Sequence, residues 1–247
     1  MENCTPLSGR VAWVTGGSSG IGAATCRKLA DLGATVGNLD RNAPSDESTP
    51  FVEIDIADEA SVQAAMGALA NLTGPPDILV CSAGISPPGA PLVDLDPQTW
   101  RRILDVNLTG SFLCVRSVLP GMMERGFGRI VTVASGAGVR VYPGAGAYAA
   151  SKAGLISLTK VIAHEGAPHG VTANVVAPGL TDTPMTRALG LDAASLAEAV
   201  VSSPVANPMH VVLTAEDQAE AIAWFCLPGS SHVTGQTMHV NGGGWMP

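Results

Sequence analysis

The sequence predicts an α/β fold, in which a doubly wound parallel sheet of about seven strands carries helices on both faces. The first observation is that short apolar runs, as long as buried strands, alternate with longer segments of helical periodicity. The second is a glycine-rich turn that directly follows the first apolar run. The third is the absence of any Pro/Gly/Ser-rich linker within the 247 residues. We therefore expect one domain over residues 1–247, with an insertion around 180–212 that contacts the substrate.

Composition limits the function classes. Apolar residues make up 46% of the chain and charged residues 14%, enough apolar material for a sizeable core. A net charge of −8 argues against nucleic acid or an anionic membrane as the main partner. We find no membrane-spanning run and no signal peptide, and the five cysteines show no Cys-x-x-Cys spacing. These features predict a cytoplasmic protein with reduced thiols, and the scattered histidines predict no metal site.

The first predicted unit is strand, glycine turn and helix. Residues 11–14 form an apolar run, glycines follow at Gly16, Gly17, Gly20 and Gly22, and residues 23–32 have helical periodicity. Glycines suit a turn that needs unusual dihedral angles and close approach to a ligand. A helix that begins near residues 19–20 would point its free N–H groups and positive dipole end at a phosphate. A tight turn without a ligand is the alternative.

The second predicted strand covers residues 35–39 and ends at Asp40. An acidic residue about 20 positions after the glycines is where a dinucleotide site binds the adenosine ribose hydroxyls. The alternative is an aspartate that only caps a turn. The connection over residues 41–50 is polar, contains two prolines and is too short for a crossover with a helix. We therefore expect an irregular segment there.

The other elements follow in alternation. Strands are expected at residues 51–54, 78–81, 129–133, 171–176 and 237–240. Helices are expected at residues 58–72, 96–123, 148–165, 193–201 and 214–225. In the second of these helices, Gly110 and Pro120 are expected bending points. Because the carboxyl ends of parallel strands meet at one edge, we expect Gly16, Asp40, Ser82, Ser135 and Pro178 to lie along that edge.

The chemistry is predicted to lie at Tyr148 and Lys152, which are four residues apart at the start of a predicted helix and so share one face. A lysine ammonium beside a phenol favours the phenolate and lowers its pKa. Such a tyrosine can exchange a proton with a hydroxyl or carbonyl oxygen. Ser135 lies at a strand's carboxyl end, where its hydroxyl could bind the same oxygen, although a capping serine is the alternative.

The chain resembles the short-chain dehydrogenase/reductase family, in the branch whose chains have this length. The resemblance covers nearly the whole chain and rests on Thr15-Gly16-x-x-x-Gly20-x-Gly22, Asp55, Asn107, Ser135, Tyr148-x-x-x-Lys152, Pro178-Gly179, Val233-Thr234-Gly235-Gln236 and Asn241-Gly242-Gly243. It implies a three-layer Rossmann fold, Tyr148 as general acid/base, Ser135 orienting the substrate oxygen and Lys152 on the nicotinamide ribose. It implies that Asn107 holds a water for proton relay, whereas stabilising a helix irregularity is its alternative role.

The resemblance also implies a nicotinamide dinucleotide site. The cofactor-binding residues would be Gly16, Ser18, Ser19, Gly20, Ile21, Gly22, Asp40, Arg41, Asp55, Ile56, Ser82, Ala83, Gly84, Tyr148, Lys152, Pro178, Gly179, Leu180 and Thr183. Asp40 favours NAD, because its carboxylate would repel the 2′-phosphate of NADP. Ser19 stands where NADP-preferring relatives usually have a basic residue, while Arg41 is the evidence against NAD.

The expected substrate is a largely uncharged secondary alcohol or ketone. Its pocket would be lined by small or apolar residues, namely Ser135, Gly136, Ala137, Tyr142, Tyr148, Leu180, Met185 and Leu189, with residues 86–88 opposite. Alternatives are a dihydrodiol dehydrogenase, suggested by the short 41–50 connection, and a 3-hydroxyacyl or 3-oxoacyl thioester oxidoreductase. Two alternatives are not alcohol oxidoreductases, namely an NAD(H)-sensing binding protein and an extended epimerase or dehydratase. The NAD(H)-sensing protein is disfavoured because Tyr148 and Lys152 are both present. The epimerase or dehydratase is disfavoured by the glycine spacing and the chain length.

The resemblance further implies a homo-oligomer, most often a tetramer. Apolar residues lie nearly all round the predicted helix after Tyr148, so one side can face the sheet while another needs a partner. One departure from the family is Cys81-Ser82-Ala83-Gly84, where the family usually has Asn-Asn-Ala-Gly. This departure affects one structural amide contact and leaves the cofactor site in place.

Overall fold

A computed structural model describes residues 5–45 and 49–246. Seven strands form one sheet in the order β3-β2-β1-β4-β5-β6-β7, and every neighbouring pair is parallel. The strands are β1 (Val11–Thr15), β2 (Thr35–Asp40), β3 (Phe51–Glu53), β4 (Ile78–Cys81), β5 (Gly128–Val133), β6 (Val171–Pro178) and β7 (Thr237–Val240). The order reverses between β1 and β4, so the predicted doubly wound fold is confirmed, and the crevice for a ligand lies at that point.

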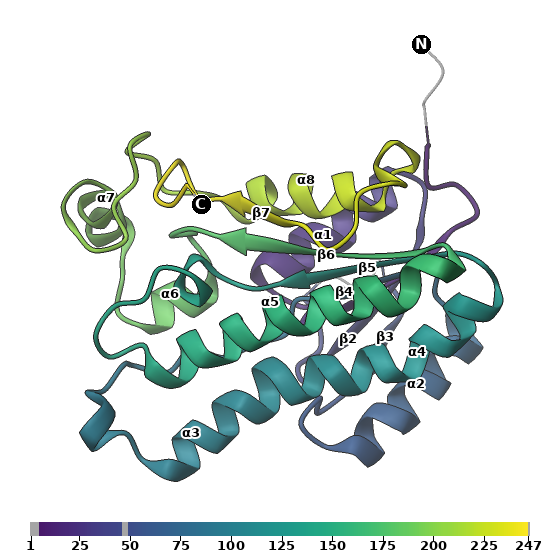
Figure 1. The fold of residues 1–247 in the computed structure, drawn as a ribbon, viewed down its shortest axis with the longest axis horizontal. Coiled ribbons are helices and arrows are strands. Elements are labelled where there is room, and N and C mark those ends of the chain that lie inside the picture. The colour runs from purple at the N-terminus through teal and green to yellow at the C-terminus, as the bar shows by residue number, and fades with distance from the viewer. Residues whose placement is uncertain (1–4, 46–48, 247) are drawn as a thin grey trace.

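Helices cover both faces of the sheet (Figure 1). They are α1 (Gly20–Asp31), α2 (Glu59–Thr73), α3 (Pro97–Leu104), α4 (Gly110–Glu124), α5 (Gly146–Gly166), α6 (Pro184–Ala188), α7 (Ala193–Ser202) and α8 (Ala215–Cys226). Helices α1 and α8 pack together on one face, and α2, α4 and α5 cover the other (Figure 1). Helices α6 and α7 lie beyond the carboxyl ends of the strands (Figure 1), and residues of α6 line the crevice.

The two faces of the sheet each bury a separate core. On β1, Trp13 packs with the core under α2 and α4, while Ala12 and Val14 pack with the core under α1 and α8. This alternation is the two-residue period of a strand. Since both faces are covered, the central strands read as continuous apolar runs, which is why their positions could be predicted.

Helix starts agree with the capping residues in the sequence. Asp58 accepts a hydrogen bond from the N–H of Ser61, and Asp96 accepts one from the N–H of Thr99 at 2.8 Å. Pro97 occupies the first helical position after Asp96. Thr214 and Asp217 cap α8 reciprocally. These contacts satisfy N–H groups that a helix leaves unpaired at its start.

Three segments differ from the sequence-based expectation. The helix predicted over residues 96–123 is α3 and α4 joined by a π-helical turn, Asp105–Thr109, and Pro120 lies inside α4. Helix α5 begins at Gly146, two residues before Tyr148. The insertion at 180–212 contains α6 in addition to the expected α7, because Thr183 and Thr186 form a capping box ahead of a short helix. In the 41–50 connection the described residues form no helix, as expected.

One helical stretch meets the length and hydropathy of a membrane span, although the sequence analysis expected none. Residues Pro97–Glu124 have a mean hydropathy of 1.2 over their most apolar window, and 50% of that window is buried inside the fold. A core helix of a soluble protein has the same properties. The apolar side of α4 packs into the core through Leu113, Val115 and Met122, which accounts for its hydropathy.

Candidate active site

The glycine turn places the first backbone groups of the site. Gly16 has φ +70° and approaches Ala83 so closely that a Cβ on Gly16 would lie 2.7 Å from the Cα of Ala83. Gly20, with φ +50°, begins α1. Ser19 is the N-cap of α1, but its side chain makes no capping hydrogen bond, and the first turn contains no acidic residue. The first N–H groups of α1 are therefore available to an anion such as a pyrophosphate.

Asp40 ends β2 beside this turn and holds it in place. Its Oδ2 accepts a hydrogen bond from the N–H of Ser18 at 3.0 Å, and its Oδ1 accepts one from the N–H of Asn42 at 3.0 Å. The hydroxyl of Ser18 donates to the carbonyl of Asn42 at 2.6 Å and accepts from the amide of Asn38 at 3.0 Å. The carboxylate keeps further lone pairs that can accept hydrogen bonds from a ligand.

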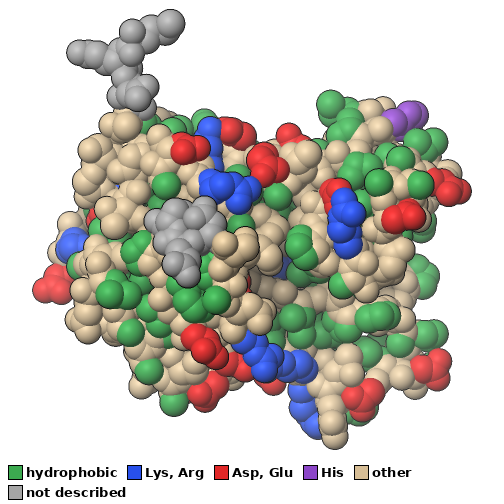
Figure 2. Space-filling model, turned by 180° about the vertical axis from the view of Figure 1, so that it is seen from behind, with side chains coloured by type: hydrophobic (Ala, Val, Ile, Leu, Met, Phe, Trp, Pro, Cys, Tyr) green, Lys and Arg blue, Asp and Glu red, His purple; other side chains and the backbone are tan. Residues whose placement is uncertain are grey.

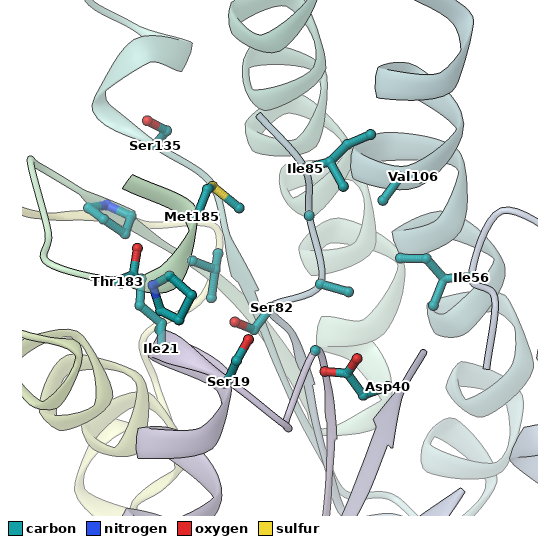
Figure 3. Close-up of a pocket in the computed structure, with 18 of the residues that line it drawn as sticks. Ser19, Ile21, Asp40, Ile56, Ser82, Ile85, Val106, Ser135, Thr183 and Met185 are labelled. Carbon is teal, nitrogen blue, oxygen red and sulfur yellow. The ribbon is translucent and has the colours of Figure 1, made fainter. Parts of the chain in front are cut away.

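The next loop supplies the far end of the site. Asp55 follows β3, and its Oδ1 accepts a hydrogen bond from the N–H of Ala57 at 3.0 Å. Arg102, from α3, lies 3.5 Å from Asp55 Oδ2 across the mouth of the site. The apolar side chains Ile56 and Val106 lie beside each other near this end, whereas Ser135 lies at the opposite end (Figure 3). A flat, uncharged ring would suit the apolar end.

Ser135, Tyr148 and Lys152 meet at the other end of the site. Ser135 follows β5, while Tyr148 and Lys152 lie in the first two turns of α5. Lys152 is 4% exposed, and its ammonium donates a hydrogen bond to the carbonyl of Val133 at 2.8 Å. Gly84 lies close to this side chain, since a Cβ there would be in van der Waals contact with Lys152 Nζ at 3.4 Å. The three residues line one hollow, as expected from their positions in the sequence.

The direction of the Tyr148 pKa shift differs from the expectation. Burial raises the pKa of Tyr148 to about 12, although a hydrogen bond with Ser135 lowers it. Burial lowers the pKa of Lys152 to about 8, because the charged ammonium loses its hydration. The Nζ of Lys152 lies 5.7 Å from the centroid of the Tyr148 ring. In this structure the loss of hydration raises the pKa of Tyr148 by more than the Ser135 hydrogen bond lowers it.

Asn107 lies in the π-helical turn and is fully buried. Its Oδ1 accepts from the N–H of Ile85 at 2.8 Å, and its Nδ2 donates to the carbonyl of Ile85 at 3.0 Å. Nδ2 also donates to the hydroxyl of Ser151 at 3.1 Å. Both amide hydrogens are thus used within the protein, where they join the loop after β4 to α5.

These residues surround one hollow with a cavity volume of about 430 Å³. Figure 2 shows the molecule hollowed near the middle of the face opposite to that of Figure 1, with Lys and Arg side chains scattered among Asp and Glu. Of the predicted cofactor residues, the hollow is lined by Gly16, Ser19, Gly20, Ile21, Gly22, Asp40, Arg41, Asp55, Ile56, Ser82, Ala83, Gly84, Tyr148, Lys152, Pro178, Gly179 and Thr183. Its shape and its unpaired N–H groups fit a dinucleotide.

Some predicted site residues lie elsewhere. Ser18, Leu180 and Ala137 are not among those lining the hollow. The backbone N–H of Ser18 donates a hydrogen bond to Asp40. Thr181, rather than Leu180, lines the hollow, and Ala137 is buried. Met185 lines the hollow rather than a separate substrate pocket. Ser18 and Leu180 lie in loops, where the sequence carries no periodicity from which to read side-chain direction.

Other lining residues were missed by the sequence analysis. They are Leu39, Asn42, Ile54, Ile85, Arg102, Val106, Val133, Ala134, Thr181, Pro184 and Thr186. Several of them directly adjoin a predicted site residue in the sequence, and this adjacency could have identified them, for example Leu39, Ile54, Ile85 and Ala134. Nothing local marked Arg102, because its position depends on the tertiary packing that brings α3 next to Asp55.

A second cavity of about 270 Å³ adjoins the first, and Tyr148 lines both. Of the expected substrate residues, Tyr142, Leu189 and residues 86–88 line this second cavity. Its walls come from the 86–90 loop, the 142–145 loop and α3. The backbones of Gly89 and Gly144 touch, since a Cβ on Gly89 would lie 2.7 Å from the Gly144 carbonyl oxygen. Among the described residues, no group of His, Cys, Asp and Glu could hold a metal ion.

The parallel sheet, the glycine turn at its switch point and the tyrosine–lysine pair define an oxidoreductase of the Rossmann type. A family model described as "Enoyl-(Acyl carrier protein) reductase" matches residues 16–244. The chain belongs to the short-chain dehydrogenase/reductase family, whose members act on CH–OH groups with nicotinamide cofactors.

Named relatives agree with this assignment. The chain is 38% identical to the cis-4-hydroxycyclohexanecarboxylate dehydrogenase of Sinomonas cyclohexanicum, over 95% of this chain and 96% of that one. It is 37% identical to the 3-oxoacyl-[acyl-carrier-protein] reductase FabG of Vibrio cholerae, over 97% and 99% of the two chains. The solved structure of levodione reductase is similar with a TM-score of 0.89 and 29% identity, covering 96% of this chain and 97% of that one.

Proposed function

We propose that the chain is an NAD(H)-dependent dehydrogenase/reductase that interconverts a largely uncharged secondary alcohol and its ketone. The observation that carries the proposal is the meeting of Ser135, Tyr148 and Lys152 in one hollow, with Asp40 at its other end. A reacting carbon near Tyr148 would thus lie at the nicotinamide end of a bound dinucleotide.

In alcohol oxidation, the reacting form of Tyr148 is the phenolate, which nearby positive charge favours. The phenolate oxygen takes the proton of the substrate hydroxyl, and the carbon gives up a hydride for which a bound nicotinamide would be the acceptor. Ser135 donates a hydrogen bond to the substrate oxygen and so fixes its position beside Tyr148. Lys152 binds the nicotinamide ribose and brings positive charge near the phenol. A bound nicotinamide ring supplies the chemistry of hydride transfer. Ketone reduction runs through the same groups, with the Tyr148 proton returning to the oxygen.

Asp40 supports NAD rather than NADP as the cofactor. Its carboxylate already accepts two backbone hydrogen bonds, from Ser18 and Asn42, so its position is fixed at the edge of the hollow. Ribose hydroxyls can donate to its remaining lone pairs, whereas a 2′-phosphate would be repelled. Arg41 also lines the hollow and is the residue that could accept a phosphate.

Ser135, Tyr142 and Leu189 remain the proposed substrate residues, and Ala137 and Leu180 are proposed to support the loops around them. The cofactor residues that line the hollow keep their proposed roles, and Ser18 is proposed to act through Asp40. Asn107 is proposed to position Tyr148 rather than to touch the substrate, because its side-chain amide is already bonded within the protein.

We propose a homotetramer in the cytoplasm. Phe112 on α4 and Val161 on α5 are 42% and 50% exposed, and both project from the helical layer that the family resemblance implicates in pairing. Four cysteines of the described chain, Cys26, Cys81, Cys114 and Cys226, are free and buried, which suits a reducing compartment. Light scattering at micromolar concentration is expected to give a tetramer, and a monomer would contradict the proposal.

The proposed function is tested by steady-state turnover of a broad alcohol panel with NAD and with NADP, followed by NADH absorbance. NAD-dependent oxidation of at least one secondary alcohol is expected. Failure with every alcohol, together with tight NADH binding, would instead favour a cofactor-sensing protein. Preference for a 3-hydroxyacyl thioester over every free alcohol would favour the thioester alternative.

A further inference from the structure

The second cavity contains no charged side chain. It is lined by Ser86, Pro87, Pro88, Gly89, Ala90, Leu95, Thr99, Ile103, Tyr142, Pro143, Gly144, Ala145, Ala147, Tyr148 and Leu189. Burying a carboxylate against such walls would be costly without a cation to pair with it. A neutral substrate avoids that cost. The volume of about 270 Å³ suits a compact molecule such as a substituted six-membered ring.

Four arginines lie within two residues of these walls in the sequence, and none of the four is among the residues that line the cavity. Arg101 is exposed, and Arg102 pairs with Asp55 at 3.5 Å. Arg140 donates to the carbonyl of Gly244 at 2.5 Å. Arg187 forms a two-pronged ion pair with Asp182, with distances of 2.8 and 2.7 Å. Neither side chain lines the cavity. The relative from Sinomonas is named for a carboxylate substrate, and the second cavity of this chain provides no comparable partner for one.

The polar groups of the cavity are hydroxyls. Tyr148 is the proposed acid/base, and the Thr99 hydroxyl already donates to Asp96 at 3.1 Å. Within the described residues, no hydrogen bond is found for the hydroxyls of Tyr142 and Ser86. Tyr142 is 38% exposed, so much of its ring is covered while its hydroxyl is left for another partner.

The Tyr142 phenol also lies near the reacting end of the cavity. It lines the same space as Tyr148, and charge on Tyr142 would raise the pKa of the Tyr148 phenol. The loop that carries Tyr142 is fixed by the contact between Gly144 and Gly89 and by a turn in which the N–H of Ala145 donates to the Tyr142 carbonyl at 3.3 Å. Its phenol is therefore held beside the cavity rather than on a free loop.

We propose that Tyr142 is a specificity-determining residue that binds a second oxygen of the substrate, and that the substrate is a compact, neutral diol or hydroxyketone. Tyr148 exchanges the proton of the reacting oxygen, and Tyr142 forms a hydrogen bond with the other. This inference rests on the proposed function, since it places the reacting alcohol at Tyr148.

The test compares wild type with Tyr142→Phe, using cyclohexanol, the 1,2-, 1,3- and 1,4-cyclohexanediols and cis-4-hydroxycyclohexanecarboxylate as probes with NAD. The wild type is expected to oxidise at least one diol with kcat/KM about five- to tenfold above that for cyclohexanol, the gain from one net hydrogen bond of about 1–1.4 kcal/mol. The carboxylate is expected to be the poorest of the six-membered rings. Tyr142→Phe is expected to bring the ratio of diol to cyclohexanol close to one.

Val141→Ala is the matched control, because Val141 is 72% exposed and does not line the cavity. This variant is expected to keep the wild-type ratio, and thermal melting checks that both variants fold. A diol preference that persists in Tyr142→Phe, no diol preference in wild type, or preference for the carboxylate would each overturn the inference. These outcomes leave the proposed function intact if the broad panel still shows alcohol oxidation, whereas that function fails if no alcohol is oxidised.

Discussion

Asn107 donates a hydrogen bond from Nδ2 to the Ser151 hydroxyl at 3.1 Å, and Ser151 in turn donates to the carbonyl of Tyr148 at 2.7 Å. The same amide group holds both backbone groups of Ile85. One buried side chain therefore joins the loop after β4 to the first turn of α5. The π-helical turn brings Asn107 to this junction, because a continuous α-helix would rotate it away.

Asn107→Ala is expected to lower the free energy of unfolding by about 2–3 kcal/mol, because it removes three hydrogen bonds of a fully buried side chain. It also leaves the partly buried N–H and carbonyl of Ile85 without this partner. Urea unfolding measures this loss. Ser117→Ala is the matched control, since its hydroxyl bonds only within α4 and the residue is exposed. The control is expected to change stability by less than about 0.5 kcal/mol. Equal free energies of unfolding for the two variants would contradict a stabilising role of Asn107 between the loop after β4 and α5.

Tyr148→Phe is expected to lower kcat by about 10²–10⁴-fold, because it removes the group that exchanges the proton. NADH binding, followed by fluorescence, is expected to persist because Asp40 and the start of α1 are unchanged. A variant that keeps more than about a tenth of the wild-type kcat would show that another group moves the proton.

Lys152→Met is expected to change how stability depends on pH in the protein without cofactor. The pKa of Lys152 falls to about 8 on folding from an ordinary value of 10.5, so the unfolded chain binds more protons between these values. Stability from this group is therefore lowest below pH 8 and rises as the pH increases towards 10.5. Across this pH range, the free energy of unfolding of the wild type should rise by about 3 kcal/mol relative to that of Lys152→Met.

Urea unfolding of both proteins from pH 7 to 10 checks this difference. Lys160→Met is the matched control, since Lys160 is exposed on the same helix and its removal should leave the wild-type pH dependence in place. A constant difference between wild type and Lys152→Met at every pH would mean that Lys152 folds with an ordinary pKa.

Asp40→Asn and Asp40→Ala test the choice of cofactor through kcat/KM for NAD and NADP. The wild type is expected to prefer NAD by at least about tenfold, or 1.4 kcal/mol. Both variants are expected to lose most of that preference, because neither repels a 2′-phosphate. Asp40 accepts the Ser18 and Asn42 N–H groups on different oxygens, so Asp40→Asn keeps an acceptor for one of them, whereas Asp40→Ala keeps none. Comparing the two variants therefore separates the loss of charge from the full loss of the structural role.

Asp31→Ala serves as the control for a general charge effect, because Asp31 is exposed at the end of α1. The Asp31→Ala variant should prefer NAD over NADP as strongly as the wild type does. Equal use of the two cofactors by wild type itself would mean that Arg41 governs this end of the hollow.

Local sequence alone predicted those parts of the site that lie on a single helix or directly after a single strand. The glycine turn follows β1 directly, and Tyr148 and Lys152 share a helix face at a spacing of four residues, so neither needed knowledge of distant contacts. Asp96 and Pro97 likewise placed the start of α3. Ser135 lies on a different element, and its place at a strand's carboxyl end suggested that it joins the pair. The resemblance to a family then implied its role in orienting the substrate oxygen.

The tertiary structure decided the features that depend on burial and on crossing elements. Arg102 reaches Asp55 only because α3 crosses the mouth of the hollow, and the second cavity exists only where the 86–90 and 142–145 loops touch. The raised pKa of Tyr148 also came from burial, whereas the sequence offered only its neighbour Lys152. Periodicity and capping are local and can be read along the chain, but hydration is lost through contacts between distant residues, which only the folded chain brings together.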